Sequence, residues 1–206
     1  VRVESEVVAE EPAVLATALR FTGTRDGGAF ENRSLVLSVW HGDRIVASEV
    51  LADVTPRAEV LARVAALAEQ ERNLAVRHVR ERVAAFGARD WDRMREAFNA
   101  ACTYDDRRGA LGHELEGGRE GIIAVHRDIA RDATALMRVE VLATHGDRWC
   151  SFRLVITGDG GGSAGPWEVV LAEHLRVDEE GRGLWAEVSE DTGPAGAAER
   201  LAHLAT

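Results

Sequence analysis

Lysine is absent from this sequence of 206 residues, and all 25 of its basic residues are therefore arginine. Without lysine the chain cannot form a Schiff base and cannot supply the lysine of a phosphate-binding loop. The 35 acidic residues give a net charge of -10. This charge is divided evenly, because residues 1–71 hold 12 acids and 7 arginines and residues 72–206 hold 23 acids and 18 arginines. No segment has the basic excess that attracts nucleic acid or an anionic membrane surface, so we expect neither partner.

Cysteine is also scarce, since Cys102 and Cys150 are the only two. Two thiols are too few for a disulfide framework, which favours a reducing, cytoplasmic location. The seven histidines include no pair at i, i+4 and no His-x-His spacing, so we expect no metal ion and no cofactor. No apolar run approaches the roughly 20 residues of a membrane span, and the opening residues do not resemble a signal peptide. Because the first residue is Val1, we expect a segment of a longer protein.

Weak internal matches suggest that the chain contains a repeat. Arg2-Val3-Glu4 recurs as Arg138-Val139-Glu140, Glu49-Val50 as Glu187-Val188, and residues 58–62 as residues 198–202, at offsets of 136, 138 and 140 residues. The alternative is that any two antiparallel meanders look alike. A true repeat predicts a complete domain at residues 72–206. It predicts a partial copy at residues 1–71, with strands and a C-terminal helix but no opening helices. The strands of residues 1–54 would then need a partner surface for their apolar face.

Apolar spacing predicts three helices at the start of the complete copy. The first presents Val76, Val79, Val83 and Phe86 on one face and is expected to stop at Gly87. Asp90 is the expected N-cap of the second helix. The apolar positions of the second and third helices are Trp91, Met94, Phe98 and Ala101, and Ile122, Val125 and Ile129.

A period of two follows in residues 137–188 and predicts strands. Helices followed by a meander indicate an α+β fold. We expect a cone in which three N-terminal helices pack against a curved, antiparallel four-stranded sheet and enclose a cavity. The partial copy would add a second antiparallel sheet.

Three stretches carry a family resemblance: Phe86-Gly87-Ala88-Arg89-Asp90-Trp91-Asp92, Tyr104-Asp105-Asp106-Arg107 and Glu116-Gly117-Gly118-Arg119-Glu120-Gly121-Ile122. Residues 72–190 resemble the nuclear transport factor 2-like superfamily and, within it, the SnoaL-like domains. The resemblance implies a helical opening, a short strand and four long strands, and it says little about activity. Residues 104–108 also look like domains appended to large bacterial signalling ATPases and cyclases.

Glu173 is the most informative candidate for chemistry, because it shares one face of a strand with Leu171 and Leu175. Burial there would raise the pKa of the carboxyl and suit it to general acid or base catalysis. The alternative is an ion pair with an arginine such as Arg153. His126 lies beside Val125 on the third helix, as a hydrogen-bonded core residue or as half of a dyad with Asp106 or Glu173.

Further candidates come from the same expected cavity. Tyr104 and Asp106 share one face of the short strand and would line the cavity. The alternating residues Asp105 and Arg107 would form a solvated face with a surface ion pair that contributes little. Trp91 would floor the cavity or pack in the core. At the long strand of the partial copy, Val39 stands where the complete copy has Glu173, so the expected site belongs to residues 72–206. The full ligand-binding set is Trp91, Tyr104, Asp106, His126, Arg153 and Glu173, with Glu173, His126 and Asp106 as the catalytic candidates.

Gly160, Gly162 and Gly165 spell G-x-G-x-x-G, the pattern of a dinucleotide-binding loop. That loop must open a helix, whereas Pro166-Trp167 and a strand follow here. We therefore expect a hairpin connection and no dinucleotide.

Two functions fit these features. The first is a non-catalytic module that binds a small apolar or amphipathic ligand or mediates protein interaction, with sheet-to-sheet pairing within the chain or in a homodimer. Such a module could form the C-terminal part of a larger bacterial signalling protein. The alternative is a SnoaL-like cyclase, isomerase or hydrolase that uses a pocket carboxylate with His126 or Tyr104. A third arrangement swaps the partial copy between two chains.

Overall fold

The computed structural model describes residues 1–52, 55–108, 117–160 and 165–206. The chain forms two compact units, Val1–Glu71 and Arg72–Thr206. Each unit combines an antiparallel meander with helices, so the α+β class is confirmed. No helix in the described ranges is long and apolar enough to cross a membrane.

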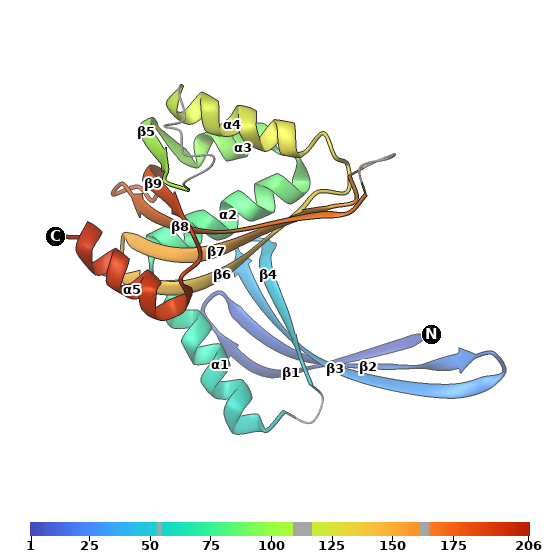
Figure 1. Cartoon of the computed structure of the whole chain (residues 1–206). Coiled ribbons are helices and arrows are strands. Elements are labelled where there is room, and N and C mark those ends of the chain that lie inside the picture. The colour runs from blue at the N-terminus through green and yellow to red at the C-terminus, as the bar shows by residue number, and fades with distance from the viewer. Residues whose placement is uncertain (53–54, 109–116, 161–164) are drawn as a thin grey trace. The chain divides into compact units, whose positions relative to one another are not determined.

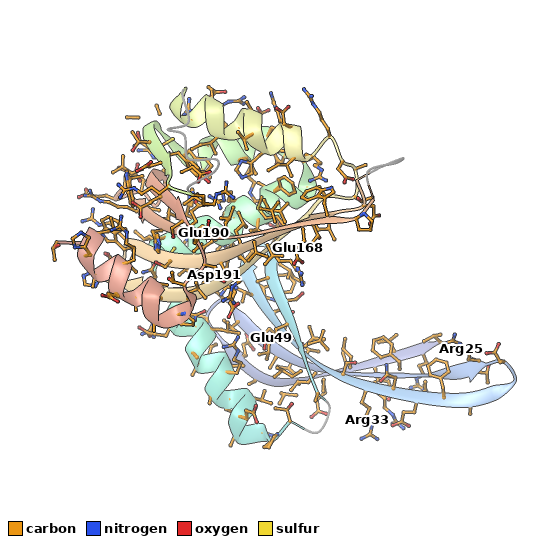
Figure 2. All side chains as sticks on the ribbon, viewed as in Figure 1. Arg25, Arg33, Glu49, Glu168, Glu190 and Asp191 are labelled. Carbon is orange, nitrogen blue, oxygen red and sulfur yellow. The ribbon has the colours of Figure 1, made fainter. Side chains whose placement is uncertain are left out.

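The first unit begins with four strands in the order of the chain: β1 (Arg2–Glu11), β2 (Val14–Arg25), β3 (Gly28–His41) and β4 (Arg44–Leu51). Every neighbouring pair is antiparallel (Figure 1). Asp26 and Gly27 connect β2 to β3, and both have positive φ angles of 53° and 81°. Two such residues form the type I′ turn that suits a twisted hairpin. Arg33, which projects from β3 in Figure 2, pairs with Glu31 on the same strand.

Helix α1 (Arg57–Gln70) packs against β1 and β2 of this sheet. Its buried residues Val60, Val64 and Leu67 recur at i, i+4 and i+7, which is one face of a helix. Arg63 of α1 also donates to Glu49 of β4, with 3.0 Å between Nη2 and Oε2. The helix expected at the C-terminal end of this unit thus covers part of the sheet formed by β1 to β4, so the apolar face of these strands does not depend wholly on a partner surface from elsewhere.

The second unit opens with α2 (Leu74–Ala88). The side chain of Asn73 caps its N-terminus by accepting from the backbone N–H of Val76. The prediction that Gly87 stops this helix is wrong, because Gly87 lies inside α2. The left-handed residue is Arg89, with φ 55°, and its guanidinium donates to the carbonyls of Phe86 and Ala135. These bonds cap the helix at its end, which lies one residue beyond Gly87.

Helix α3 (Trp91–Glu96) begins as predicted, with Asp90 accepting from the N–H of Arg93. It ends at Glu96, five residues before Ala101, the last residue of the apolar face that was predicted for this helix. Phe98 and Ala101 belong instead to β5 (Phe98–Asp106). The carbonyl of Ala97 accepts from the N–H of Gly183, so pairing with a distant strand replaces further helical turns.

The remaining elements are α4 (Gly118–Ile129), β6 (Leu136–His145), β7 (Trp149–Gly158), β8 (Trp167–Val177), β9 (Gly183–Ser189) and α5 (Gly193–Leu204). The sheet order is β5-β9-β8-β7-β6, and β5 runs parallel to β9. The expected antiparallel four-stranded sheet is therefore a five-stranded, mixed sheet. The described residues contain five helices, all after the first sheet, so the count differs from the expected three and no helix lies at the N-terminus of the chain. Three of the five, α2, α3 and α4, precede β6 at the start of the second unit.

Different helices lie on the two faces of this sheet (Figure 1). Phe152, Leu154 and Ile156 of β7 are buried in the main core together with residues of α2 and α4. The neighbouring Ser151 points the other way, toward the carbonyl of Ala197 in α5. The alternation predicted for β7 is thus confirmed, and α5 lies on the face opposite to α4.

Several expectations remain outside this description. Glu116 of the family resemblance and Gly162 of the glycine pattern lie outside the described residues. Gly160 and Gly165 precede β8 and no helix, as expected for a hairpin connection. The internal repeat and the sheet-to-sheet pairing stay predictions.

Candidate functional site

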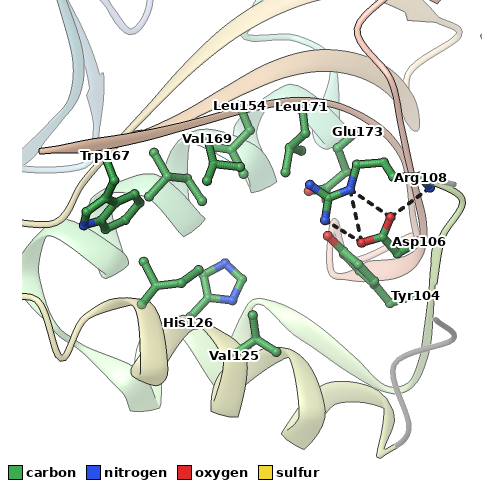
Figure 3. Close-up of a pocket in the computed structure, with 12 residues that line it drawn as sticks. Tyr104, Asp106, Arg108, Val125, His126, Leu154, Trp167, Val169, Leu171 and Glu173 are labelled. Carbon is green, nitrogen blue, oxygen red and sulfur yellow. Dashed lines mark hydrogen bonds and ion pairs between the residues drawn. The ribbon is translucent and has the colours of Figure 1, made fainter. Parts of the chain in front are cut away.

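A cavity of about 290 Å³ lies in the second unit, between α4 and the strands β7 and β8 (Figure 3). Pockets for small molecules usually measure from about 300 Å³ upward, so the cavity suits a small ligand. Its lining residues are Tyr104, Asp106, Arg108, Val125, His126, Ile129, Leu154, Ile156, Trp167, Val169, Leu171 and Glu173.

The cavity has a polar end and an apolar end. Figure 3 shows Tyr104, Asp106, Arg108 and Glu173 together at one end and Trp167 at the other. Aliphatic side chains of β7 and β8 lie between them, and His126 and Val125 of α4 face those strands across the cavity. An elongated molecule with a polar head and an apolar body would match this arrangement.

Glu173 is buried and paired with Arg82 of α2. Arg82 donates Nη1–H to Oε1 at 2.6 Å and Nη2–H to Oε2 at 2.9 Å, and neither side chain is more than 1% exposed. The guanidinium carbon also lies 5.2 Å from the ring centroid of Phe152. Two parallel, charge-assisted hydrogen bonds of this kind are strong and fix the orientation of the carboxylate. The alternative of an arginine partner therefore applies to Glu173, but the partner is Arg82 and not Arg153.

Sequence reasoning missed Arg82, although a signal was present. Ala75, Val79, Arg82 and Phe86 recur at i, i+4, i+7 and i+11, and all four are buried. A single arginine in such an apolar stripe indicates a buried acidic partner, because an unpaired charge in a core is very costly. The buried Glu173 on the apolar face of β8 is that partner.

Asp106 and Arg108 form a second ion pair at the polar end. The Arg108 side chain donates Nη2–H to Oδ2 at 2.6 Å and Nε–H to Oδ1 at 2.9 Å. The backbone N–H of Arg108 also donates to Oδ1, which bends the end of β5 around the carboxylate. Side-chain exposures of 22% for Arg108 and 13% for Asp106 leave this pair within reach of a ligand.

His126 presents a neutral imidazole to the cavity. Its Nδ1 lies 2.8 Å from the carbonyl of Ile122, and the proton must sit on Nδ1 for this hydrogen bond to form. Burial, and after it the charge of Arg82, lowers the pKa of His126 to about 4. The ring is therefore uncharged at neutral pH, and its Nε2 is an acceptor.

Tyr104 completes the polar end from β5. Burial raises the pKa of its phenol well above the ordinary value, and the negative charge of Glu173 raises it further. Tyr104 therefore keeps its proton and acts as a hydroxyl donor or acceptor.

Four of the six residues predicted from the sequence line the cavity: Tyr104, Asp106, His126 and Glu173. Trp91 instead packs edge-on against Phe86, with 6.2 Å between ring centroids, and is not a lining residue. Arg153 points to the other face of β7 and pairs with Glu140 and with Asp191, which is labelled in Figure 2.

No hydrogen bond among the described side chains joins His126 to Asp106 or Glu173. Both carboxylates are held by arginines, so neither orients the imidazole. Within the described ranges, no three acidic, histidine or cysteine side chains form a metal-binding group. The arrangement can hydrogen-bond a ligand at both ends, and its strongest ionic interactions are already made within the protein.

Known structures resemble this chain over little more than half of its length. A scan against protein-family models and a search of curated proteins both give no match. A putative polyketide cyclase from Sinorhizobium meliloti aligns with 54% of this chain and 93% of its own, at 20% identity and a TM-score of 0.41. A protein from Catenulispora acidiphila with a ketosteroid isomerase-like fold, solved with trimethylamine, aligns with 59% of this chain and 92% of its own, at 21% identity and 0.42.

A Mycobacterium tuberculosis protein in complex with estradiol-17β-hemisuccinate aligns with 58% of this chain and 95% of its own, at 14% identity and a TM-score of 0.47. Such values describe a likeness over little more than half of the chain. They carry no argument about the ligand or the reaction.

Proposed function

We propose that the second unit binds an uncharged, amphipathic small molecule in the cavity beneath α4. The observation that carries the proposal is the balance of charge. Arg82 with Glu173 and Arg108 with Asp106 give two positive and two negative groups, and His126 is neutral. A charged ligand head would lose its hydration and find no unpaired counter-charge, whereas a neutral hydroxyl or carbonyl keeps its hydrogen bonds.

The polar groups fit the two ends of such a ligand. Tyr104 and the Arg108–Asp106 pair can both donate to and accept from a hydroxyl head. The Nε2 of His126 can accept one further hydrogen bond along the body of the ligand. The aliphatic walls then contribute about 0.8 kcal/mol for each methylene that they remove from water.

The same features favour binding over catalysis. A general base is most effective when its pKa lies near the working pH, and the pKa of His126 is lowered to about 4. Glu173 is engaged at both oxygens by Arg82. A SnoaL-like cyclase, isomerase or hydrolase remains the second candidate, because a free imidazole nitrogen and a phenol line one cavity.

Calorimetric titration with three naphthalene probes tests the proposal. At neutral pH we expect 2-naphthol to bind at least tenfold more tightly than 2-naphthoate or 2-naphthylmethylammonium. Val169→Trp should abolish binding because Val169 lines the cavity, and Val170→Trp is the matched control on the adjacent β8 residue outside the lining. Equal or tighter binding of a charged probe, or binding that Val169→Trp leaves unchanged, would reject the proposal.

We also propose that residues 72–206 are a complete nuclear transport factor 2-like domain and residues 1–71 a partial copy of it. The supporting observation is topological. An antiparallel meander of four strands followed by a helix occurs as β1 to β4 with α1 and again as β6 to β9 with α5. Expression of residues 72–206 alone tests this division: a folded fragment that binds 2-naphthol like the full chain supports it, and an unfolded fragment rejects it.

A further inference from the structure

The carboxylate of Asp132 joins three segments beside the apolar end of the cavity. Its Oδ2 accepts from the indole Nε1–H of Trp167 at 2.9 Å and from the backbone N–H of Gly160 at 2.8 Å. Its Oδ1 accepts from the N–H and the hydroxyl of Thr134, at 2.9 and 2.6 Å. Donors from the start of β8, the end of β7 and the turn after α4 therefore converge on one side chain.

Gly158 lies close to the same edge of the indole. Gly158 and Trp167 are partners in the register of β7 and β8. A Cβ atom at Gly158 would collide with Oδ2 of Asp132 and lie 2.7 Å from the Trp167 ring. The absence of a side chain at Gly158 therefore leaves room for the edge of the indole whose N–H is bonded to Asp132, and together the two residues restrict the movement of the ring.

Trp167 lines the end of the cavity opposite Arg108 and Asp106 (Figure 3). A fixed wall at that end limits how far the apolar body of a ligand can extend when its head is bound at the other end. We propose that Asp132 is a positioning residue that sets the maximum ligand length through Trp167. Asp132 itself does not line the cavity. The inference rests on the proposed function, since it assumes that an amphipathic molecule occupies the cavity.

A series of 1-alkanols from 1-pentanol to 1-decanol measures this limit by calorimetry or by displacement of 2-naphthol. In the wild-type chain, affinity should rise about fourfold per methylene, reach a maximum and then fall. Asp132→Asn and Gly158→Ala should move the maximum to an alcohol at least two methylenes longer. The shortest alcohols should keep their affinity within twofold, because they do not reach Trp167.

Trp167→Phe is a further variant that still tests the inference if Asp132→Asn or Gly158→Ala fails to fold. It leaves the Thr134 and Gly160 bonds to Asp132 in place and removes only the indole donor, and it should lengthen the limit like Asp132→Asn. Asp128→Asn is the control, because it makes the same charge change at an exposed carboxylate paired with Arg131. An unchanged limit in all the Asp132, Gly158 and Trp167 variants would overturn the inference.

Hydrogen exchange of the indole N–H gives a test that needs no ligand. The chain has five tryptophans, and the signal missing from Trp167→Phe identifies Trp167. Its exchange should be at least tenfold faster in Asp132→Asn than in the wild type and in Asp128→Asn; equal rates would refute the positioning role. If no alkanol binds the wild-type chain, the proposed function and the length limit fail together. In that case, the hydrogen-exchange rates of the indole N–H still test whether Asp132 positions the Trp167 ring.

Discussion

Arg82 of α2 and Glu173 of β8 join a helix to the sheet through two parallel hydrogen bonds in the interior of the second unit. The two residues are 91 positions apart in the chain, and both are essentially inaccessible to solvent. Their pairing fixes the charge of the polar end of the cavity. Burial, and after it the positive charge of Arg82, also lowers the pKa of His126 and makes it a weak base.

Removing one member of this pair should strongly destabilise the protein. Arg82→Met leaves a buried carboxylate without its partner, and Glu173→Gln leaves a buried guanidinium, so each should lower the free energy of unfolding by about 3 to 5 kcal/mol. The double variant Arg82→Met/Glu173→Gln should lose less than the sum of the single changes. Urea unfolding measures all of these, with Asp128→Asn at an exposed pair as a control that changes by less than about 1 kcal/mol. Additive losses would contradict a coupled pair.

His126 should make stability depend on pH. Its pKa is about 4 in the folded protein and about 6.5 in the unfolded chain, so the unfolded chain binds the proton first as the pH falls. This residue should therefore cost about 1.4 kcal/mol of stability between pH 7.5 and pH 5.5. His78, whose pKa is lowered to about 3, adds a loss of the same sign.

His126→Gln separates the two histidines, because an amide can still donate to the carbonyl of Ile122. Urea unfolding at the two pH values should show a loss smaller by about 1.4 kcal/mol in this variant than in the wild type. Equal losses would contradict the lowered pKa of His126. Titration of the imidazole signals by NMR checks the same pKa directly.

The sequence patterns located this region because they reflect local geometry. Alternation along β8 put Glu173 on the same face as Leu171 and Leu175, and that face lines the cavity. Asp90 was recognisable as an N-cap because its hydrogen bond spans only three residues. Local periodicity was therefore sufficient to predict which side chains share a face.

Local periodicity failed where a distant partner decides the structure. Phe98 and Ala101 have helical spacing, yet β5 forms because its backbone pairs with β9, about 85 residues further along the chain. The partner of Glu173 was missed for the same reason, since Arg82 lies on a helix and the pairing depends on how that helix packs. Neither the pairing of β5 with β9 nor that of Arg82 with Glu173 can be predicted from the spacing of residues within a single helix or strand.

Two glycines should respond in opposite ways to substitution by alanine. Gly87 lies inside α2, and a Cβ there would meet nothing within 4 Å, so Gly87→Ala should stabilise the protein by about 0.5 to 1 kcal/mol. A Cβ at Gly183 would lie 2.8 Å from Phe98 and 2.9 Å from His78, so Gly183→Ala should destabilise it by about 1 to 3 kcal/mol. Thermal unfolding of both variants measures the difference. A stabilising Gly183→Ala would contradict the close packing of β5 on β9.

Changing the charge at the polar end should change which ligand head is preferred. Arg108→Met removes a positive charge and leaves Asp106 to attract a cation, so 2-naphthylmethylammonium should gain about tenfold in affinity relative to 2-naphthol. Asp106→Asn removes the negative charge, and 2-naphthoate should gain by a similar factor through Arg108. Asp128→Asn, on the exposed side of α4, serves as the control for net charge. The two variants must shift the preference in opposite directions, because a general loosening of the cavity would weaken or strengthen all three probes together.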